Sequence, residues 1–332
     1  MRRVRGAAAM AAVLVALVLA GCGGGGAPPT TPTIPPPSTS GGGGALDPGV
    51  EVQPGAFPAG GGSGTVASRR YPGVLWAIRD RGGQDKPGRP QNALYAYKVT
   101  GGRVGKVAGA AFKAIRMPVP ARDWEDIARD DDGNLWIGDI GNNECDRDDT
   151  ALLKVREPDP AATGKAKLLA TYHYRFPDPP AGCAGRNAEA MFLVDDVPYL
   201  IAKAEPSTVY RFPRLDPDAT VTLEKVGVLA GDVVNLSGAD LSADRTRLAV
   251  DTHTALYIYQ AGDPSADGAA LVADLISRPP AWTVQLGGGQ AAGGGGAATN
   301  VEGVAFGWDS HDLNLLAENR DVYFVPASVY ER

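Results

Sequence analysis

The chain has 332 residues, a formal net charge of −6 at pH 7 and 44% hydrophobic residues. This length and apolar content are sufficient for one large folded domain with a substantial core. The acidic balance argues against nucleic acid and against an anionic lipid surface as partners, because both carry negative charge.

The first residues are typical of an export signal. Arg2, Arg3 and Arg5 precede an apolar run, residues 7–20, that is shorter than a membrane span. A short buried helix of a globular protein should be amphipathic, whereas this run is apolar all round. Residues 1–21 are therefore predicted to be a secretion signal.

The signal ends in Leu19-Ala20-Gly21-Cys22, which resembles the bacterial lipoprotein box. The resemblance implies cleavage before Cys22, a lipid that includes palmitate on its sulfur, and anchoring at the extracytoplasmic face of the cell membrane. Residues 22–45 are nearly all Gly, Pro, Ser and Thr, a composition that makes an extended tether rather than a core. Residues 46–332 are then expected to fold at some distance from the membrane.

Four segments of this domain begin alike, each with a carboxylate that opens a short apolar strand. The segments are Asp123–Ala128, Asn187–Phe192, Ser237–Ser242 and Asn300–Ala305. The recurring acids lie about 50 to 65 residues apart, which is too long for a solenoid repeat and suits one multi-stranded blade per repeat. The pattern predicts an all-β propeller with a ring of acids.

Short β-branched and aromatic runs bounded by turn residues predict the further strands of each blade. In chain order they are 64–68, 73–78, 93–99 and 103–107, then 134–138, 151–155 and 167–174, then 188–194, 198–202, 208–212 and 220–229, then 239–242, 248–251, 256–260 and 269–276. These runs give blades of four antiparallel strands.

The last blade is one strand short, because the chain after Glu302 is long enough for only three strands. We expect residues 46–52 to supply the missing fourth strand and so to close the ring. Five blades result, within the range known for propellers. Six blades remain the alternative if a long repeat contains an extra blade.

Propeller geometry brings the start of each first strand and the end of each second strand to the same face. The expected partners are Glu125 with Asp139 and Asn142, Glu189 with Lys203, Asp240 with Asp251 to His253, and Glu302 with Glu318. The sequence therefore predicts one acidic mouth of the central channel.

Several of these motifs together carry a family resemblance. They are Asp123–Ala128, Gly138–Asn143 with Arg147, Asn187–Ala190, Lys203, Gly238–Ser242 and Glu302–Ala305. Through them, residues 63–325 resemble an uncharacterised family of secreted bacterial β-propeller lipoproteins, similar in turn to lactonase-like and phytase-like propellers. The resemblance implies the fold and no particular reaction. The chain departs from it at Asp251–His253, where the family tends to keep an arginine.

An acidic mouth is suited to a hard cation, since Ca²⁺ takes about six to eight oxygen ligands in flexible geometry. The predicted ligands are Glu125, Asp139, Asn142, Glu189, Asp240 and Glu302. Zinc is disfavoured, because the three histidines, His173, His253 and His311, do not pair at a ligand spacing. The preferred function is binding of an unknown small molecule or extracytoplasmic protein, with Ca²⁺ or another divalent ion in the mouth.

Two other functions remain open. A metal-dependent hydrolase of an ester, lactone or phosphoester would use one carboxylate as base and Lys203 or Arg147 to hold an anionic group. His253 and Glu318 are further expected ligand contacts. An interaction scaffold without metal would instead use residues 139–143 as turn caps and the glutamates as a structural ring. The sequence does not decide whether the protein is an enzyme.

Two cysteines remain after Cys22, and disulfides persist in an extracytoplasmic compartment. Cys145 and Cys183 both fall on the mouth side of the predicted topology. We expect a disulfide between them, which would contribute about 3 to 4 kcal/mol in the chain-entropy model.

Overall fold

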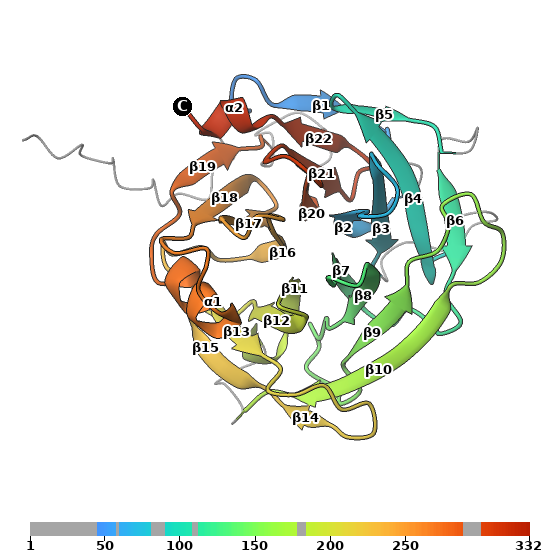
Figure 1. The fold of residues 1–332 in the computed structure, drawn as a ribbon, viewed down its shortest axis with the longest axis vertical. Coiled ribbons are helices and arrows are strands. Elements are labelled where there is room, and N and C mark those ends of the chain that lie inside the picture. Colours follow the sequence, from blue (N-terminus) through green and yellow to red (C-terminus); the bar gives the residue numbers. More distant parts are fainter. Residues whose placement is uncertain (1–44, 58–59, 81–89, 108–111, 178–183, 288–299) are drawn as a thin grey trace, which may run out of the picture. The chain divides into compact units, whose positions relative to one another are not determined.

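The computed structural model describes residues 45–57, 60–80, 90–107, 112–177, 184–287 and 300–332. They belong to one compact unit, Ser40–Arg332. Five antiparallel sheets are arranged around a central axis (Figure 1), so the predicted five-bladed propeller is confirmed. The predicted signal, Cys22, its tether and Cys183 lie outside the described residues, and the predictions for them stay predictions. No described helix is long and apolar enough to cross a membrane.

The first two blades contain the strands that follow the predicted order. Blade one has β2 (Gly62–Ala67), β3 (Val74–Arg79), β4 (Ala93–Thr100), β5 (Arg103–Gly105) and β6 (Lys113–Arg116). Blade two has β7 (Trp124–Arg129), β8 (Asn134–Asp139), β9 (Ala151–Arg156) and β10 (Lys167–Arg175). Strand β6, which was not predicted, pairs with β4 beside β5.

Blade three has β11 (Ala188–Val194), β12 (Val197–Ala202), β13 (Thr208–Arg211) and β15 (Glu224–Val228), preceded by a single helical turn, η1 (Ala184–Arg186). Blade four has β16 (Leu236–Leu241), β17 (Arg247–Thr252), β18 (Ala255–Gln260) and β19 (Trp282–Gln285). Blade five has β20 (Val301–Phe306), β21 (Leu313–Ala317), β22 (Val322–Val325) and β1 (Glu51–Gln53). In blades one to four, the innermost strand is the first of its blade in the sequence. In blade five the innermost strand is β20, and β1, which comes much earlier in the chain, is the outermost strand.

Strand β1 closes the ring as predicted. It pairs antiparallel with β22, with Val52 opposite Tyr323. The last blade is thus completed by the start of the domain, which joins the two ends of the ring without a covalent link. A short helix, α2 (Ala327–Tyr330), follows β22.

One predicted strand, residues 269–276, is wrong, because this segment is the helix α1 (Gly268–Ile276). The Asp267 side chain accepts the amide of Ala270 and caps the helix. Its buried residues are Leu271, Val272, Leu275 and Ile276. They recur with the period of a helix face rather than that of a strand. The fourth strand of the blade is instead β19.

The predicted strand 220–229 is in fact two strands in two sheets. Its first part, β14 (Val221–Thr222), pairs in parallel with β10 of blade two. Its second part, β15, pairs with β13 of blade three. The segment therefore connects the outer edges of two neighbouring blades.

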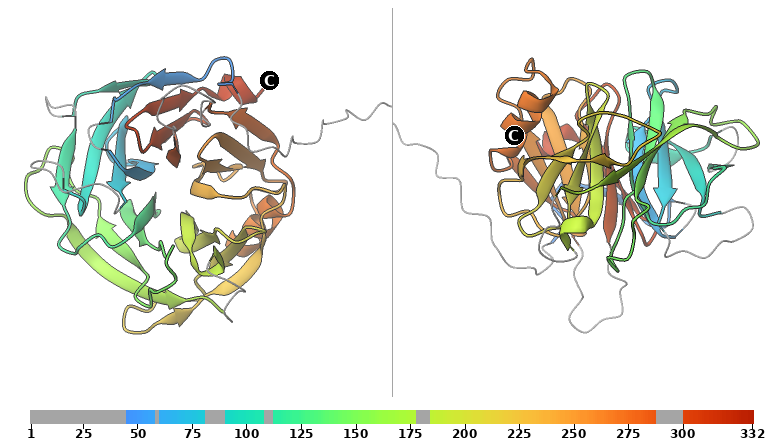
Figure 2. Two further views of the ribbon diagram at one scale, coloured as in Figure 1. Left: turned by 180° about the vertical axis from the view of Figure 1, so that it is seen from behind. Right: turned by 90° about the horizontal axis from the view of Figure 1, so that it is seen from below.

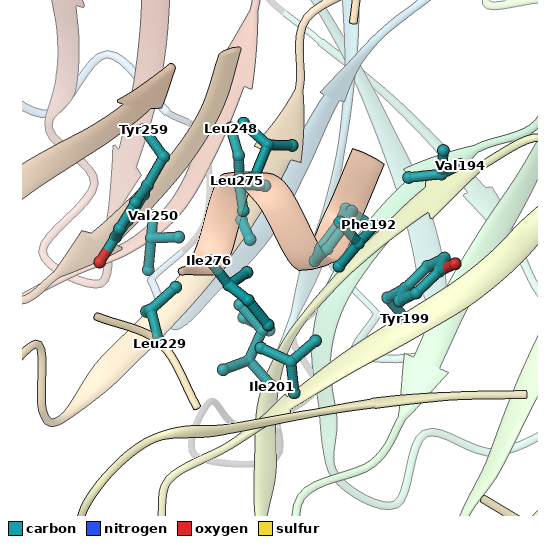
Figure 3. Packing of buried hydrophobic residues seen from close by; sticks show 14 of the residues in the cluster. Phe192, Val194, Tyr199, Ile201, Leu229, Leu248, Val250, Tyr259, Leu275 and Ile276 are labelled. Atoms are coloured by element: carbon teal, nitrogen blue, oxygen red, sulfur yellow. The ribbon is translucent and has the colours of Figure 1, made fainter. Parts of the chain in front are cut away.

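The core lies between neighbouring blades. Leu275 and Ile276 of α1 belong to one buried cluster with Phe192 and Ile201 of blade three and Val250 of blade four (Figure 3). Helix α1 lies at the periphery of the ring (Figure 2) and covers this junction. Burial of each such side chain stabilises the fold by about 1.5 to 3 kcal/mol. The packing holds the inner strands at fixed positions around the axis.

Candidate functional site

Each inner strand carries an irregularity close to its beginning. The pairing with the second strand skips one residue in four blades, between Trp124 and Asp126, Ala188 and Ala190, Leu236 and Gly238, and Val301 and Gly303. A bulge of this kind redirects a side chain away from the regular pleat. The skipped residues occupy equivalent positions around the axis, and they are Glu125, Glu189, Ser237 and Glu302.

Three of these four side chains line a pocket of about 210 Å³ at one end of the axis. Its lining residues are Gly62, Ser63, Asp80, Asp123, Glu125, Asn143, Glu189, Lys203, His253, Asn300, Glu302 and Glu318. Six of the predicted site residues come together here: Glu125, Glu189, Lys203, His253, Glu302 and Glu318. Asn143 was expected at the mouth with the other residues of 139–143, whereas Asp123 was not assigned to the site, although it stands within a recognised motif.

Asp240 does not belong to this pocket, and its predicted grouping with the other acids is wrong. It lies four residues after the start of β16, at the opposite end of the inner strand, and lines a separate cavity with Arg69 and Arg129. Its carboxylate accepts the amide of Phe306 at 2.9 Å, and burial raises its pKa to about 6. The residue of β16 that corresponds to Glu125, Glu189 and Glu302 is Ser237. The sequence prediction omitted it because serine carries no charge.

Asp139, Asn142 and Arg147 form a support beside the pocket and do not line it. Arg147 Nη2 pairs with Asp139 Oδ1 at 2.8 Å, and its Nη1 donates to the carbonyl of Gly141 at 2.7 Å. The Arg147 amide donates to Asn142 Oδ1 at 3.1 Å. Asp139 Oδ1 also accepts the amide of Asp123 at 3.0 Å. These contacts fix the loop after β8 and place Asp123 at the pocket.

Glu125 stands in the most crowded part of the pocket. A methyl group at Gly141 would clash with both Glu125 Oε1 and Asp123 Oδ2, so the two carboxylates converge on this glycine. Burial raises the pKa of Glu125 well above its ordinary value, and the charges of Glu189 and Asp123 raise it further. In the described part of the chain, no lysine, arginine or histidine forms an ion pair with Glu125.

The other acids of the pocket have resident partners. Lys203 Nζ lies 3.2 Å from Glu189 Oε1. His253 Nε2 lies 3.1 Å from Glu302 Oε1. Glu318 accepts a hydrogen bond from the Asn300 side chain at 3.2 Å. The pocket is therefore partly compensated, and Glu125 is its least compensated group.

The pair of His253 and Glu302 predicts a pH-dependent contribution to the free energy of unfolding. The hydrogen bond to Glu302 raises the pKa of His253 above its ordinary value of 6.5. The pair should stabilise the fold fully below pH 6.5, and the contribution should disappear as the pH rises through the raised pKa. Urea unfolding of His253→Asn between pH 5 and 9 should show a weaker pH dependence than the parent. His173→Asn, on an exposed position of β10, should not. Equal slopes for His253→Asn and the parent would contradict this assignment.

Below the pocket, Asp126 connects three inner strands. Its Oδ2 accepts the amides of Met191 on β11 at 2.8 Å and Ala239 on β16 at 3.1 Å. Its Oδ1 accepts the amide of Ile127 at 2.8 Å. The side chain is fully buried, and burial raises its pKa well above the ordinary value while the three amides oppose the shift. Asp126 therefore joins blades two, three and four at the axis.

Glycines complete this layer from the remaining inner strands. A Cβ at Gly64 of β2 would lie 2.5 Å from Asp126 Oδ1, and one at Gly303 of β20 would lie 2.8 Å from the Cα of Gly64. A Cβ at Gly238 of β16 would lie 3.1 Å from the Cα of Gly303. The inner strands thus meet at this level, which we call the floor of the pocket.

The predicted calcium cage is not preformed. Within the described ranges, no group of three or more histidine, cysteine, aspartate or glutamate side chains is arranged to hold a metal ion. Glu189 and Glu302 are directed towards Lys203 and His253 instead. A cation in the pocket would have to compete with these partners.

Cys145 lies half-buried in the loop after β8, next to the support formed by Arg147. Its predicted disulfide partner, Cys183, is outside the described residues. The disulfide therefore stays a prediction.

No protein family profile and no curated protein matches the chain. Among solved structures, a gluconolactonase from Xanthomonas campestris matches at 8% identity over 85% of this chain and 91% of that chain, with a TM-score of 0.42. The pyranose dehydrogenase PQQ domain from Coprinopsis cinerea matches at 10% identity over 88% and 98%, with a TM-score of 0.43. A virginiamycin B lyase from Staphylococcus aureus matches at 10% identity over 83% and 98%, with a TM-score of 0.38.

The matched structures thus include a lactonase, to which this chain is distantly similar. The comparisons do not identify the secreted lipoprotein family that the motifs suggested. At these identities and scores, the activities of the matched proteins carry no argument for this chain.

Proposed function

We propose that this protein is a lipid-anchored, extracytoplasmic binding protein whose acidic pocket takes a divalent cation, with Ca²⁺ as the primary candidate. The observation that carries the proposal is the crowding of carboxylates around Glu125. Six acids line the pocket, and Lys203 and His253 are the cationic side chains among its lining residues. Buried charge is costly unless it is paired, and Ca²⁺ prefers oxygen ligands in flexible geometry.

Cation binding in this pocket requires a local rearrangement. Glu189 would exchange Lys203 for the cation, and Glu302 would exchange His253. Glu125 needs no exchange with an ion-pair partner among the described residues, so it is the natural first contact. Because protons compete with cations for carboxylates, and because the pKa of Glu125 is raised, affinity should fall as the pH is lowered.

Calorimetric titration of Ca²⁺ into chelator-stripped protein tests the proposal. The parent protein should bind Ca²⁺ and should show a Tm that rises with Ca²⁺ concentration, since the ligand binds the folded state. Glu125→Gln, which removes the charge and keeps the shape, should bind at least about tenfold more weakly, the loss expected for one charge-assisted ligand. Glu51→Gln is the matched control, because Glu51 is exposed on β1.

A protein that shows neither heat nor a Ca²⁺-dependent Tm up to millimolar concentrations would refute the cation site. Equal binding by Glu125→Gln and the parent would place the cation elsewhere on the surface.

One observation favours the hydrolase as the alternative. His253 lines the pocket, and its imidazole is oriented by Glu302 at 3.1 Å, an arrangement that suits a general base. Ester, lactone and phosphoester substrates should be screened with and without Ca²⁺. Turnover that is lost in His253→Asn and retained in His173→Asn would show that the function is catalysis rather than binding.

A further inference from the structure

Asp251 is a carboxylate to which no other described residue donates a hydrogen bond. It lies on β17, two residues before His253, and its side chain is completely buried. The contact that its carboxylate makes is with its own backbone amide, and neither oxygen has a hydrogen-bond partner among the other described residues. Burial raises the pKa of Asp251 well above its ordinary value, and the charge of Glu302 raises it further. Buried polar groups are almost always hydrogen-bonded, so an orphaned carboxylate calls for a physical explanation.

The other blades show that the fold does not need an acid at this position. Asp251 is paired with Gly238, the residue after the bulge. The residues in the same register of blades two, three and five are Gly138, Ile201 and Leu316. An aliphatic residue or glycine satisfies the packing there, and a buried unpaired carboxylate costs stability.

The position faces the next blade. In blade five, the Leu316 side chain packs against Gly62 of blade one, where an added Cβ would lie 2.8 Å from it. In blade two, a Cβ at Gly138 would lie 2.9 Å from the sulfur of Met191 in blade three. Asp251 of blade four is correspondingly directed towards blade five. Its Oδ1 lies 2.6 Å from where a Cβ on Gly238 would stand, at the level of the floor.

A second orphaned oxygen belongs to the neighbouring inner strand. Ser237 occupies the bulge of β16, the position held by glutamates in blades two, three and five, and its hydroxyl is buried without a described partner. Glu302 occupies the corresponding bulge of β20. Ser237 thus precedes the register partner of Asp251, and Glu302 of blade five is directed towards blade four, where it pairs with His253.

We propose that Asp251, Ser237 and Glu302 form an inner cation site between blades four and five, directly below the acidic pocket. The inference rests on the proposed function and specifies where its cation comes to rest. Two carboxylates match the charge of a divalent ion, and the serine hydroxyl adds a neutral oxygen ligand. Glu302 lines the pocket, and it would be the ligand shared by the pocket and the inner site once it leaves His253.

The test uses Ca²⁺ titrations of the chelator-stripped full chain in two buffers that differ in ionisation enthalpy. The parent should release protons on binding, because Asp251 must ionise to become a ligand. Asp251→Asn should bind at least tenfold more weakly and release fewer protons. Ser237→Ala should weaken binding to a smaller extent and leave proton release unchanged.

Asp251→Leu gives a second readout, the Tm with and without Ca²⁺. A raised Tm shows that this variant is folded. The substitution introduces the residue that blade five carries in this register, so its Tm without Ca²⁺ should be higher than that of the parent. The Ca²⁺-dependent rise in Tm should nevertheless be lost. Glu51→Gln should behave like the parent in both experiments.

The outcomes separate this site from the pocket as a whole. If Asp251→Asn and Asp251→Leu bind Ca²⁺ like the parent while Glu125→Gln does not, the inner site is refuted and the proposed function stands. If the parent itself binds no Ca²⁺, both proposals fall.

Discussion

Replacing Asp126 with alanine should lower the free energy of unfolding by about 3 to 5 kcal/mol. The carboxylate accepts amides from blades two, three and four at 2.8 to 3.1 Å. Hydrogen bonds to a charged group contribute about 1.5 to 3 kcal/mol each, and the relief of carboxylate burial offsets part of their loss. The variant would leave the amides of Met191 and Ala239 without an acceptor. Urea unfolding monitored by tryptophan fluorescence measures the change.

Asp126→Asn is the matched variant, because it keeps the size of the side chain and one acceptor oxygen. It should lose roughly half as much stability, since an amide nitrogen cannot accept. Asp148→Ser, at an exposed position for which no side-chain contact is seen in the described part of the chain, should leave stability unchanged within about 0.5 kcal/mol. A loss below about 1 kcal/mol for Asp126→Ala would mean that water replaces the carboxylate and that the floor does not depend on it.

Phe57→Ala should lower the free energy of unfolding by about 3 to 5 kcal/mol, the range for large-to-small changes at buried aromatic positions. Phe57 follows β1 and is fully buried, with its ring edge-on to Tyr95 and Tyr97 at 5.7 Å each. Its amide donates to the carbonyl of Arg320 at 2.9 Å, and Arg320 Nε donates to the carbonyl of Phe57 at 2.8 Å. The residue therefore fastens the closing strand to blades one and five.

Phe57→Leu should cost less, because leucine leaves a smaller cavity. Leu46→Ala is the control within the same segment, since Leu46 is partly exposed. Limited proteolysis gives an independent readout: Phe57→Ala should be cleaved near its N-terminal strand faster than the parent. Unchanged stability together with unchanged cleavage would show that β1 alone is sufficient for closure.

The sequence was informative where the signal is repeated or local. Each blade repeats one pattern of apolar strands and turns, so the five-blade ring and its closure by β1 could be predicted. The helix α1 was missed although Asp267 and the helical spacing of Leu271 and Leu275 were visible. Its place at the outer edge of blade four favoured a strand by analogy with the other blades.

The site was only partly predictable, because it depends on register. A shift of one residue moves a side chain to the other face of a strand, and the bulge in each inner strand introduces such a shift. Asp240 looked equivalent to Glu125 in the sequence, yet Ser237 occupies that position. Whether the Asp251 carboxylate has a hydrogen-bond partner depends on the packing between two blades. The sequence of one segment alone does not determine that packing.

The floor of the pocket divides the central axis of the propeller into two ends. Inner strands from all five blades meet there, so the floor lies between the acidic pocket and the other end of the axis. The cavity around Asp240, which Arg69 and Arg129 also line, lies at that other end. The two ends of the axis therefore carry separate cavities that are lined by different side chains.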